Sequence, residues 1–238
     1  MEAFFDFSLD GSRGGGFTLF GPGHLLWLLA GAAVCALLCR GYARRGAEAR
    51  RRLALAVGLS ALGLRLLRSA LLMAAGAYSL SRLPLHLCAL SVYLCAAHAL
   101  RPRELTGQFL YAFGMPGAAF ALVFPDWSYL PLPHFTTVTG FALHILLVAY
   151  PLMRVWGGDI RPDIRAAPRC LALAMAMALP VYFFDRATDM NFMFLNWPSP
   201  GSPLEWFAFL GRPGYLLGYL PLLCAVWALL YLPFRVRR

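Results

Sequence analysis

The stretch that decides the fold is HFTTVTGFALHILLVAYPLMRVW, residues 134–156. It is long enough to cross a bilayer, because a membrane helix needs about 20 mostly apolar residues to span roughly 30 Å of hydrocarbon. Arg154 stands near its end, but His144 stands about ten residues from its start, or roughly 15 Å deep at about 1.5 Å per residue. The stretch therefore predicts a membrane helix with an ionisable side chain inside it.

Further stretches of the same kind predict an all-α, polytopic membrane bundle that forms one transmembrane domain over residues 1–238. The composition agrees, since 60% of the residues are hydrophobic and 13% are charged, with a mean hydropathy of +0.64. Little sequence remains for a soluble domain. We expect seven spans, at about 22–40, 53–77, 83–100, 106–124, 134–156, 169–187 and 213–234.

The net charge of +10 comes from arginines that gather in alternate connections. Because cytoplasmic loops of membrane proteins carry the excess of basic residues, this pattern predicts an outside N-terminus and a cytoplasmic C-terminus. It accounts for the charge without a nucleic-acid partner, and we expect none. The basic connections contain Arg40, Arg44, Arg45 and Arg50 to Arg52, then Arg101 and Arg103, then Arg154, Arg161, Arg165 and Arg169, and finally Arg235, Arg237 and Arg238.

Cysteine usage and the first residues exclude several other classes of protein. The six cysteines lie in or at the ends of apolar stretches, without metal-ligand spacing, so we expect no disulfide framework, no metal site and no other cofactor. The chain starts with the acids Glu2, Asp6 and Asp10 where a signal peptide has basic residues, so we expect no cleavable signal peptide. The cysteines are Cys35, Cys39, Cys88, Cys95, Cys170 and Cys224.

Ionisable residues inside the spans are the candidates for function, because they are costly in a membrane. Arg65 and Arg68 lie three residues apart and so share a helix face. They either pair with carbonyls or an acid, or bind an anionic head group such as phosphate. His144 is either functional or a structural hydrogen-bonding residue, and Gly140, one turn earlier, leaves room beside its ring for a helix or a ligand.

The third span is expected to place Pro84 in its first turn and Cys88 about one turn inside. A lone membrane cysteine is commonly a packing residue, and His86 near the helix start could simply bond a carbonyl. The long connection 189–213 is aromatic and weakly polar, which is typical of a cap at the lipid interface as well as of an ordinary interfacial loop.

Three motifs resemble the bacterial YwaF family of integral membrane proteins, and the match runs through most of the chain. They are Leu83-Pro84-Leu85-His86-Leu87-Cys88, Phe141-Ala142-Leu143-His144 and Asn191-Phe192-Met193-Phe194-Leu195-Asn196-Trp197-Pro198. That family is similar to the animal transmembrane protein 164 acyltransferases, in which a membrane Cys and a membrane His are implicated in moving acyl chains between phospholipids. More distantly, it resembles the androgen-induced intramembrane hydrolases, which use Thr and His.

The resemblance implies that Cys88 is the nucleophile, His144 the base and Asn191 a residue lining the site. It also implies a membrane phospholipid or lysophospholipid as substrate and a location in the bacterial plasma membrane. Two departures remove polar contacts but leave the Cys/His pair. Phe192 and Phe194 stand where the family usually has Tyr, and Ala89 stands where an acid often follows the Cys.

The chemistry implied is acyl transfer or ester hydrolysis through a thioester, with His144 taking the thiol proton of Cys88. It requires the third and fifth spans to be neighbours. A thiol in apolar surroundings ionises with difficulty, so Cys88 needs His144 or a positive group such as Arg65 or Arg68 nearby. Oxyanion donors are expected among Asn191, Arg65 and the backbone near Pro84, and Arg65, Arg68 and His86 are expected to bind the substrate.

Two other functions remain open at this point. One is a small-molecule or ion transporter, in which His144, Arg65, Arg68 and Asp185 line a relay across the bilayer. No internal repeat supports an inverted-repeat transporter. The other is a non-catalytic lipid-binding membrane protein.

Overall fold

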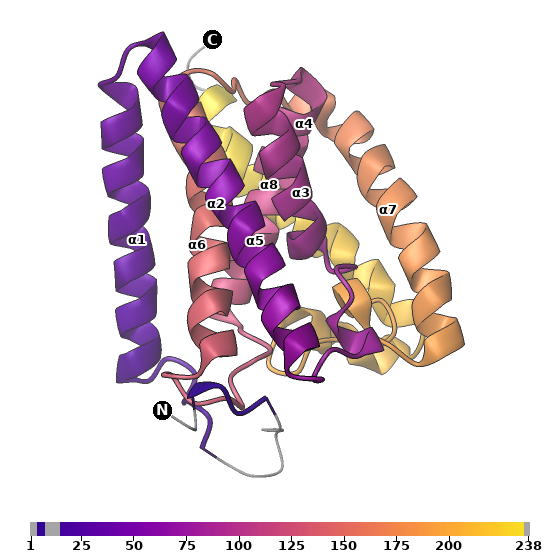
Figure 1. Ribbon diagram of the computed structural model, residues 1–238. Helices are drawn as coiled ribbons and strands as arrows, with labels where there is room; N and C mark the ends of the chain where they lie inside the picture. Colours follow the sequence, from indigo (N-terminus) through magenta and orange to yellow (C-terminus); the bar gives the residue numbers. More distant parts are fainter. Residues whose placement is uncertain (1–3, 8–14, 236–238) are drawn as a thin grey trace.

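The computed structural model of the chain describes residues 4–7 and 15–235 and is a bundle of helices (Figure 1). Helix makes up 75% of it, and no strand occurs in these two ranges. The all-α prediction is therefore confirmed. Glu2, Asp10, Arg237 and Arg238, which entered the arguments on the signal peptide and the topology, lie outside the described residues.

Successive long helices run up and down the bundle, with the N-terminal segment at the lower end of Figure 1 and the C-terminus at the upper end. Residues 104–123 form one helical stretch whose middle, η3, is π-helical. The elements are α1 (Pro22–Ala43), α2 (Ala47–Ala74), η2 (Leu80–Arg82), α3 (Leu87–Leu100), α4 (Glu104–Phe109), η3 (Leu110–Gly114), α5 (Met115–Val123), α6 (Phe135–Trp156), η4 (Ile164–Ala166), α7 (Ala167–Thr188), η5 (Phe192–Phe194), η6 (Pro203–Leu210), η7 (Gly214–Gly218) and α8 (Tyr219–Arg235).

Length and composition allow 5 helices of the described residues to cross a membrane. These are Pro22–Ala43, Ala47–Ala74, Phe135–Trp156, Ile164–Thr188 and Gly214–Phe234. The other two expected spans correspond to α3, which has 14 residues, and to the stretch 104–123, which the π-helical turn divides. The chain is thus a helical membrane protein, and the number of spans stays a prediction.

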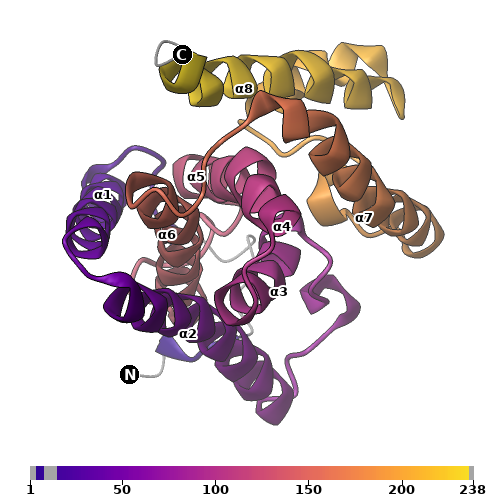
Figure 2. The same cartoon turned by 90° about the horizontal axis from the view of Figure 1, so that it is seen from above.

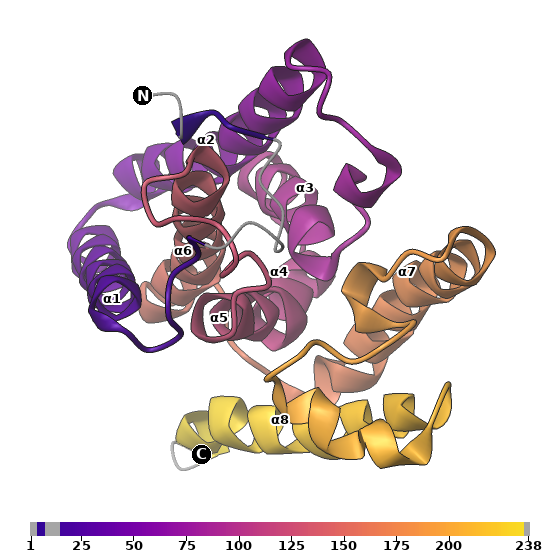
Figure 3. The same cartoon turned by 90° about the horizontal axis from the view of Figure 1, so that it is seen from below.

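Helix α6 lies at the centre of the bundle. Viewed from above, α1, α2, α3 and α5 surround it, whereas α7 and α8 lie to one side (Figures 2 and 3). Of the most apolar part of α6, 67% is buried, compared with 17–22% in the other candidate spans. The approach of α1 is close, since a Cβ added at Gly31 would lie 3.0 Å from Cγ1 of Ile145. A side chain in α6 is therefore more often buried than one in the other candidate spans.

The third span begins later than expected, and the prediction that Pro84 lies in its first turn is wrong. Helix α3 begins at Leu87, after the extended residue His86. The long connection holds His86 there, because its Nδ1 accepts a hydrogen bond from the Met193 N–H at 3.2 Å and its ring contacts Phe192 at a centroid distance of 5.2 Å. Pro84 consequently lies in a connection.

The second span begins earlier than expected, so that Arg50 belongs to α2. The side chain of Arg50 turns toward the protein. Its Nη1 donates to the carbonyl of Gly157 at 2.8 Å, and its Nε and Nη2 donate to Tyr42 at 3.1 Å and Ala43 at 2.8 Å. These carbonyls end α1 and α6, where backbone acceptors lack helical partners. Asp159 lies 3.8 Å from Arg50 as well. Arg50 therefore does more than mark orientation, since it joins two helix ends.

We predict that Arg50→Gln lowers the free energy of unfolding by about 2–3 kcal/mol, because hydrogen bonds to a charged group are lost and carbonyls are left unpaired. Unfolding of the purified protein in mixed detergent micelles measures the change. Arg52→Gln is the matched control, since its partner is the exposed Glu48 at 3.1 Å, and it should cost about 0.5 kcal/mol or less. Equal effects of the two substitutions would contradict this role of Arg50.

Candidate functional site

His144 of α6 is buried and has one nitrogen without a partner. Its Nδ1 lies 2.7 Å from the carbonyl oxygen of Gly140. A carbonyl can only accept a hydrogen bond, so Nδ1 carries the hydrogen and Nε2 carries the lone pair. Nε2 is buried and makes no hydrogen bond within the described residues. The imidazole is thus held with its basic nitrogen free.

Trp127, from the connection between α5 and α6, fixes the plane of this imidazole. The two rings stack at a centroid distance of 5.0 Å and an interplanar angle of 26°. Gly140 makes room for the indole, because a Cβ there would lie 3.1 Å from Cε2 of Trp127. The space expected beside His144 therefore exists, and a residue of the chain itself fills it.

Cys88 is the second residue of α3 and is partly buried. The backbone N–H groups of Cys88 and Ala89 are directed at its sulfur, as suits the start of a helix, where such groups stabilise negative charge. Helices α3 and α6 contact each other, so the expectation that these two spans are neighbours is confirmed. The sulfur makes no hydrogen bond to His144, since Nε2 of His144 has no partner among the described residues.

Asp126, the residue before Trp127, connects the site electrostatically. Its carboxylate interacts with Cys88, His144 and His86, and also with Arg68. It is exposed, in contrast to Trp127. Cys88, His86, His144 and Arg68 thus share one electrostatic neighbourhood that reaches the surface at Asp126.

Arg65 and Arg68 of α2 belong to the same neighbourhood. Both interact electrostatically with Cys88, and Arg68 also interacts with His144. Arg65 donates one hydrogen bond, from Nη2 to the carbonyl of Arg82 at 3.2 Å. The Nε atoms of Arg65 and Arg68 are buried without a partner within the described part of the chain. The carbonyl pairing expected as one alternative is therefore present, but it uses only part of the donor capacity.

Several buried polar atoms without a hydrogen-bond partner in the described residues belong to α2, α3, α6 and the connection before α6. In native proteins such atoms are few, and each needs a physical explanation such as a ligand or a catalytic role. Ser91 lies one turn after Cys88 on the same face of α3 and against η3, whose Gly114 would place a Cβ 3.1 Å from its Oγ. Those on the elements around the site are Arg65 Nε, Arg68 Nε, Ser91 Oγ, Trp127 Nε1, Thr137 Oγ1 and His144 Nε2.

Asn191 organises the long connection near His86. Its Nδ2 donates to the carbonyl of Trp197 at 3.0 Å, and its Oδ1 accepts from the backbone N–H groups of Asn196 and Trp197, each at 3.0 Å. The side chain is thus committed to the loop, and its lining of the site stays a prediction.

The same connection presents aromatic side chains outward. In η6, Trp206 is 73% exposed and Phe209 is 81% exposed. Such side chains suit the lipid interface, which favours the expected cap over an ordinary loop.

Asp185 lies in a different environment from His144. Its carboxyl oxygens are buried near the end of α7 and have no hydrogen-bond partner in the described ranges. The group interacts electrostatically with Tyr215, and its backbone carbonyl accepts from Asn196 and Met190. The acid that accompanies His144 is Asp126 instead.

The sequence analysis did not single out Asp126 and Trp127. They lie in the connection between α5 and α6, outside the spans in which polar residues are costly. A signal was present nevertheless, since Asp126 is the one acid between Phe124 and His134, in a connection bounded by prolines.

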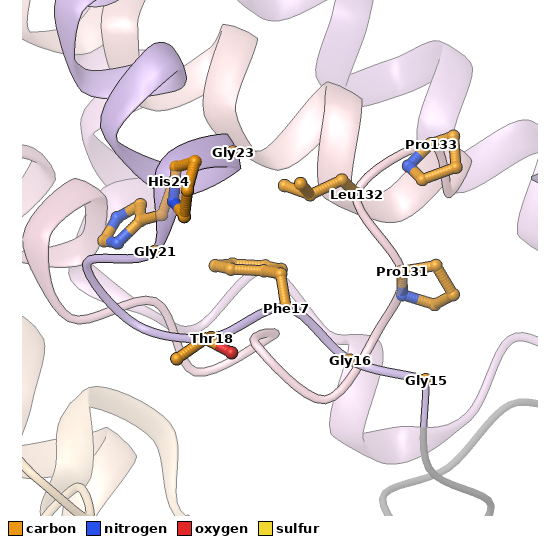
Figure 4. Close-up of a pocket in the computed structure, with 11 residues that line it drawn as sticks. Gly15, Gly16, Phe17, Thr18, Gly21, Gly23, His24, Pro131, Leu132 and Pro133 are labelled. Carbon is orange, nitrogen blue, oxygen red and sulfur yellow. The ribbon is translucent and has the colours of Figure 1, made fainter.

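A hollow of about 410 Å³ lies at the lower end of the bundle, between the N-terminal segment and residues 131–133 (Figure 4). Phe17 lies between His24 and Leu132 in it. Both nitrogens of His24 are engaged, one by the backbone N–H of Phe20 at 2.9 Å and the other by the carbonyl oxygen of Leu122 at 2.8 Å. His24 therefore has no free ring nitrogen with which to contact a ligand in the hollow.

A family model described as the TMEM164 family matches residues 19–231. The expected resemblance to the transmembrane protein 164 proteins is thereby confirmed, whereas the YwaF family and the androgen-induced hydrolases stay predictions. No curated protein and no solved structure matches the chain.

We predict that Gly140→Val destabilises the protein by about 1–3 kcal/mol, because the added methyl groups collide with Trp127. The indole should leave His144, which tryptophan fluorescence of the purified protein would report. Gly63→Val in α2 is the matched control, since a Cβ there meets nothing within 4 Å. Unchanged fluorescence and stability in Gly140→Val would disprove the tight contact.

Proposed function

The chain belongs to the TMEM164 family, and we propose that it is an intramembrane acyltransferase or acyl-ester hydrolase whose nucleophile is Cys88 and whose base is His144. The substrate is a membrane phospholipid or lysophospholipid. The observation that carries the proposal is the state of His144. Its Nδ1 is bonded to Gly140, and its Nε2 is buried without a partner in the described residues. A general base requires such a free nitrogen.

In the first half of the reaction, Nε2 of His144 takes the proton from the Cys88 thiol. The thiolate attacks the carbonyl carbon of the lipid ester, and the carbon–oxygen bond to the glycerol then breaks. The leaving alkoxide takes the proton back from His144. The products are a lysolipid and a thioester on Cys88.

In the second half, an acceptor hydroxyl gives its proton to Nε2 of His144 and attacks the thioester. The carbon–sulfur bond breaks, and the Cys88 sulfur recovers the proton from His144. A lysolipid hydroxyl makes the protein a transferase, and water makes it a hydrolase. Neither half requires a cofactor or a nucleic acid.

The backbone at the start of α3 supports this assignment. Because α3 begins at Leu87, the N–H groups of Cys88 and Ala89 are directed at the sulfur. They can stabilise negative charge on the thiolate. The same helix end can also stabilise the negative charge that develops on the adjacent oxyanion. Arg65 supplies a positive charge in the same region. His86 and Asn191 contribute by holding the long connection beside the site.

The proposal includes a topology of seven spans in the bacterial plasma membrane, with the N-terminus outside. The connections that follow α1, α3 and α6 lie at the upper end of Figure 1, together with the C-terminus. These are the arginine-rich connections, which belong on the cytoplasmic side. Cys88 and the long connection 189–213 then lie toward the outer leaflet.

We predict that a green fluorescent protein fused after Arg238 is fluorescent in bacterial cells and that alkaline phosphatase fused at the same position is inactive. The reason is that the former folds in the cytoplasm and the latter needs the oxidising outside. Fusions after Arg82 should show the reverse pattern. The same pattern at both positions would rule out the proposed topology.

We predict that Cys88→Ala abolishes acyl transfer from labelled phospholipid to lysophospholipid or water in proteoliposomes, and that His144→Gln lowers it by about 10²–10⁴-fold. The unsubstituted protein should hold a labelled acyl group that hydroxylamine releases, as expected for a thioester. Mass spectrometry should place it on Cys88.

Cys95→Ala is the control for the nucleophile, because Cys95 lies two turns further along α3 and is buried in its hydrophobic core. It should retain acyl transfer. Unchanged acyl transfer in Cys88→Ala would falsify the proposed dyad. Transfer by the unsubstituted protein without any hydroxylamine-sensitive intermediate would also contradict the thioester mechanism.

A further inference from the structure

Three arginines lie together at the lower end of α2 and in the connection that follows it. Arg68 interacts electrostatically with Arg65 and with Arg82, which is in η2. Like charges at close range repel each other, and charges inside a membrane protein are costly without compensation. Such a group is therefore stable only with acids or an anion nearby.

Among the described residues, Asp126 and Asp6 are acids that lie near this group. Other acids form ion pairs with Arg50, Arg51, Arg52 and Arg154, which lie elsewhere in the protein. Asp126 interacts with Arg68 from a distance. Asp6 lies near His134, which Arg68 and Arg82 also influence. The electrostatic surroundings of these three guanidinium groups thus include two carboxylates, so positive charge is in excess among these five groups.

The donors of these arginines are left for a further partner. The Nε atoms of Arg65 and Arg68 are buried and unbonded among the described residues. The hydrogen bond that Arg65 makes goes to a carbonyl, which carries no net charge. Guanidinium groups match the geometry of phosphate oxygens, to which they can donate in pairs.

The side chain of Arg65 extends toward the end of α2. Arg65 and Arg68 start within α2, but Nη2 of Arg65 reaches the carbonyl of Arg82, which lies beyond the end of α2 at Ala74. Long arginine side chains extend in this way toward the membrane interface. Figure 3 shows this connection running from the end of α2 to the start of α3 at the near end of the bundle.

We propose that Arg65, Arg68 and Arg82 bind the phosphate of a phospholipid and thereby place its ester carbonyl at Cys88. The placing of the ester carbonyl at Cys88 rests on the proposed function. The phosphate site does not, since it can exist without catalysis. In a phospholipid, one glycerol unit joins the phosphate to the acyl esters. Cys88, which interacts electrostatically with Arg65 and Arg68, lies within reach of the same molecule.

The site therefore selects lipids that carry a phosphate and rejects diacylglycerols with a sugar head group. The shared chemistry of a phosphate monoester, a phosphate diester and free phosphate would suit the arginines equally. The acyl chains distinguish the lipid, because they lie along the apolar surface of the helices and add affinity.

The experiment uses the full chain with Cys88→Ala, so that lipid is bound but not consumed, in nanodiscs of digalactosyldiacylglycerol with a small fraction of phosphatidylglycerol. Native mass spectrometry measures which lipid stays bound. We expect phosphatidylglycerol to be enriched over its share in the nanodisc. Arg65→Gln with Arg68→Gln should reduce this enrichment by about tenfold or more, and Lys at both positions should restore part of it.

Arg212→Gln is the matched control, because Arg212 is an exposed arginine at the same end whose guanidinium lies 4.9 Å from the Trp197 ring. It should leave the enrichment unchanged. Thermal unfolding of every variant shows whether it is folded. Equal enrichment in the folded double Gln variant and its parent overturns the phosphate site. Displacement of the lipid by inorganic phosphate at equal concentration overturns the assignment to a lipid head group.

This measurement is independent of catalysis. Selective binding of phosphatidylglycerol in a protein without acyl transfer would leave the phosphate site standing and remove the proposed function. Acyl transfer in the unsubstituted protein, together with unselective binding in the Cys88→Ala protein, would leave the proposed function standing and remove the phosphate site.

Discussion

A polar atom between helices in a membrane has no water with which to form hydrogen bonds, so it needs a partner within the protein or a ligand. At the upper end of the bundle this requirement is met, because Arg50 donates to three carbonyls that end α1 and α6. Around His144 it is not met within the described residues, where buried nitrogens and oxygens from α2, α3 and α6 are unbonded. The contrast separates a structural polar network from the candidate site, where polar groups are left for a ligand under the proposed function.

The central position of α6 explains why the free nitrogen of His144 can be maintained. Helices pack around α6 on several sides, so the imidazole cannot turn to find another partner. Its two faces are not equivalent, since Trp127 covers one of them and Gly140 provides the space for that indole. The proposed base is thus fixed in tautomer and in orientation before any substrate is bound, which would lower the cost of reaching the reactive geometry.

The long connection between α7 and α8 influences the proposed nucleophile, Cys88, through the start of α3. It holds His86 through Met193, Phe192 and Phe194, and His86 is the residue from which α3 starts. The connection thereby sets where the N–H groups at the start of α3 point, including those directed at Cys88. Phe192 and Phe194 serve this purpose with their rings alone, because ring contact with His86 requires no hydroxyl group.

The sequence by itself determined the helical membrane class, the approximate helix positions and the polar residues worth attention, because apolar length and the cost of buried charge are local properties. The span at 134–156 was predicted almost to the residue, and Cys88, His144, Arg65 and Arg68 were named as candidates. Tertiary structure alone decided that α3 starts at Leu87, that Arg50 joins two helix ends and that Asp126 and Trp127 belong to the site. Each of these depends on contacts between segments far apart in the chain, and no local pattern of residues specifies which segments meet.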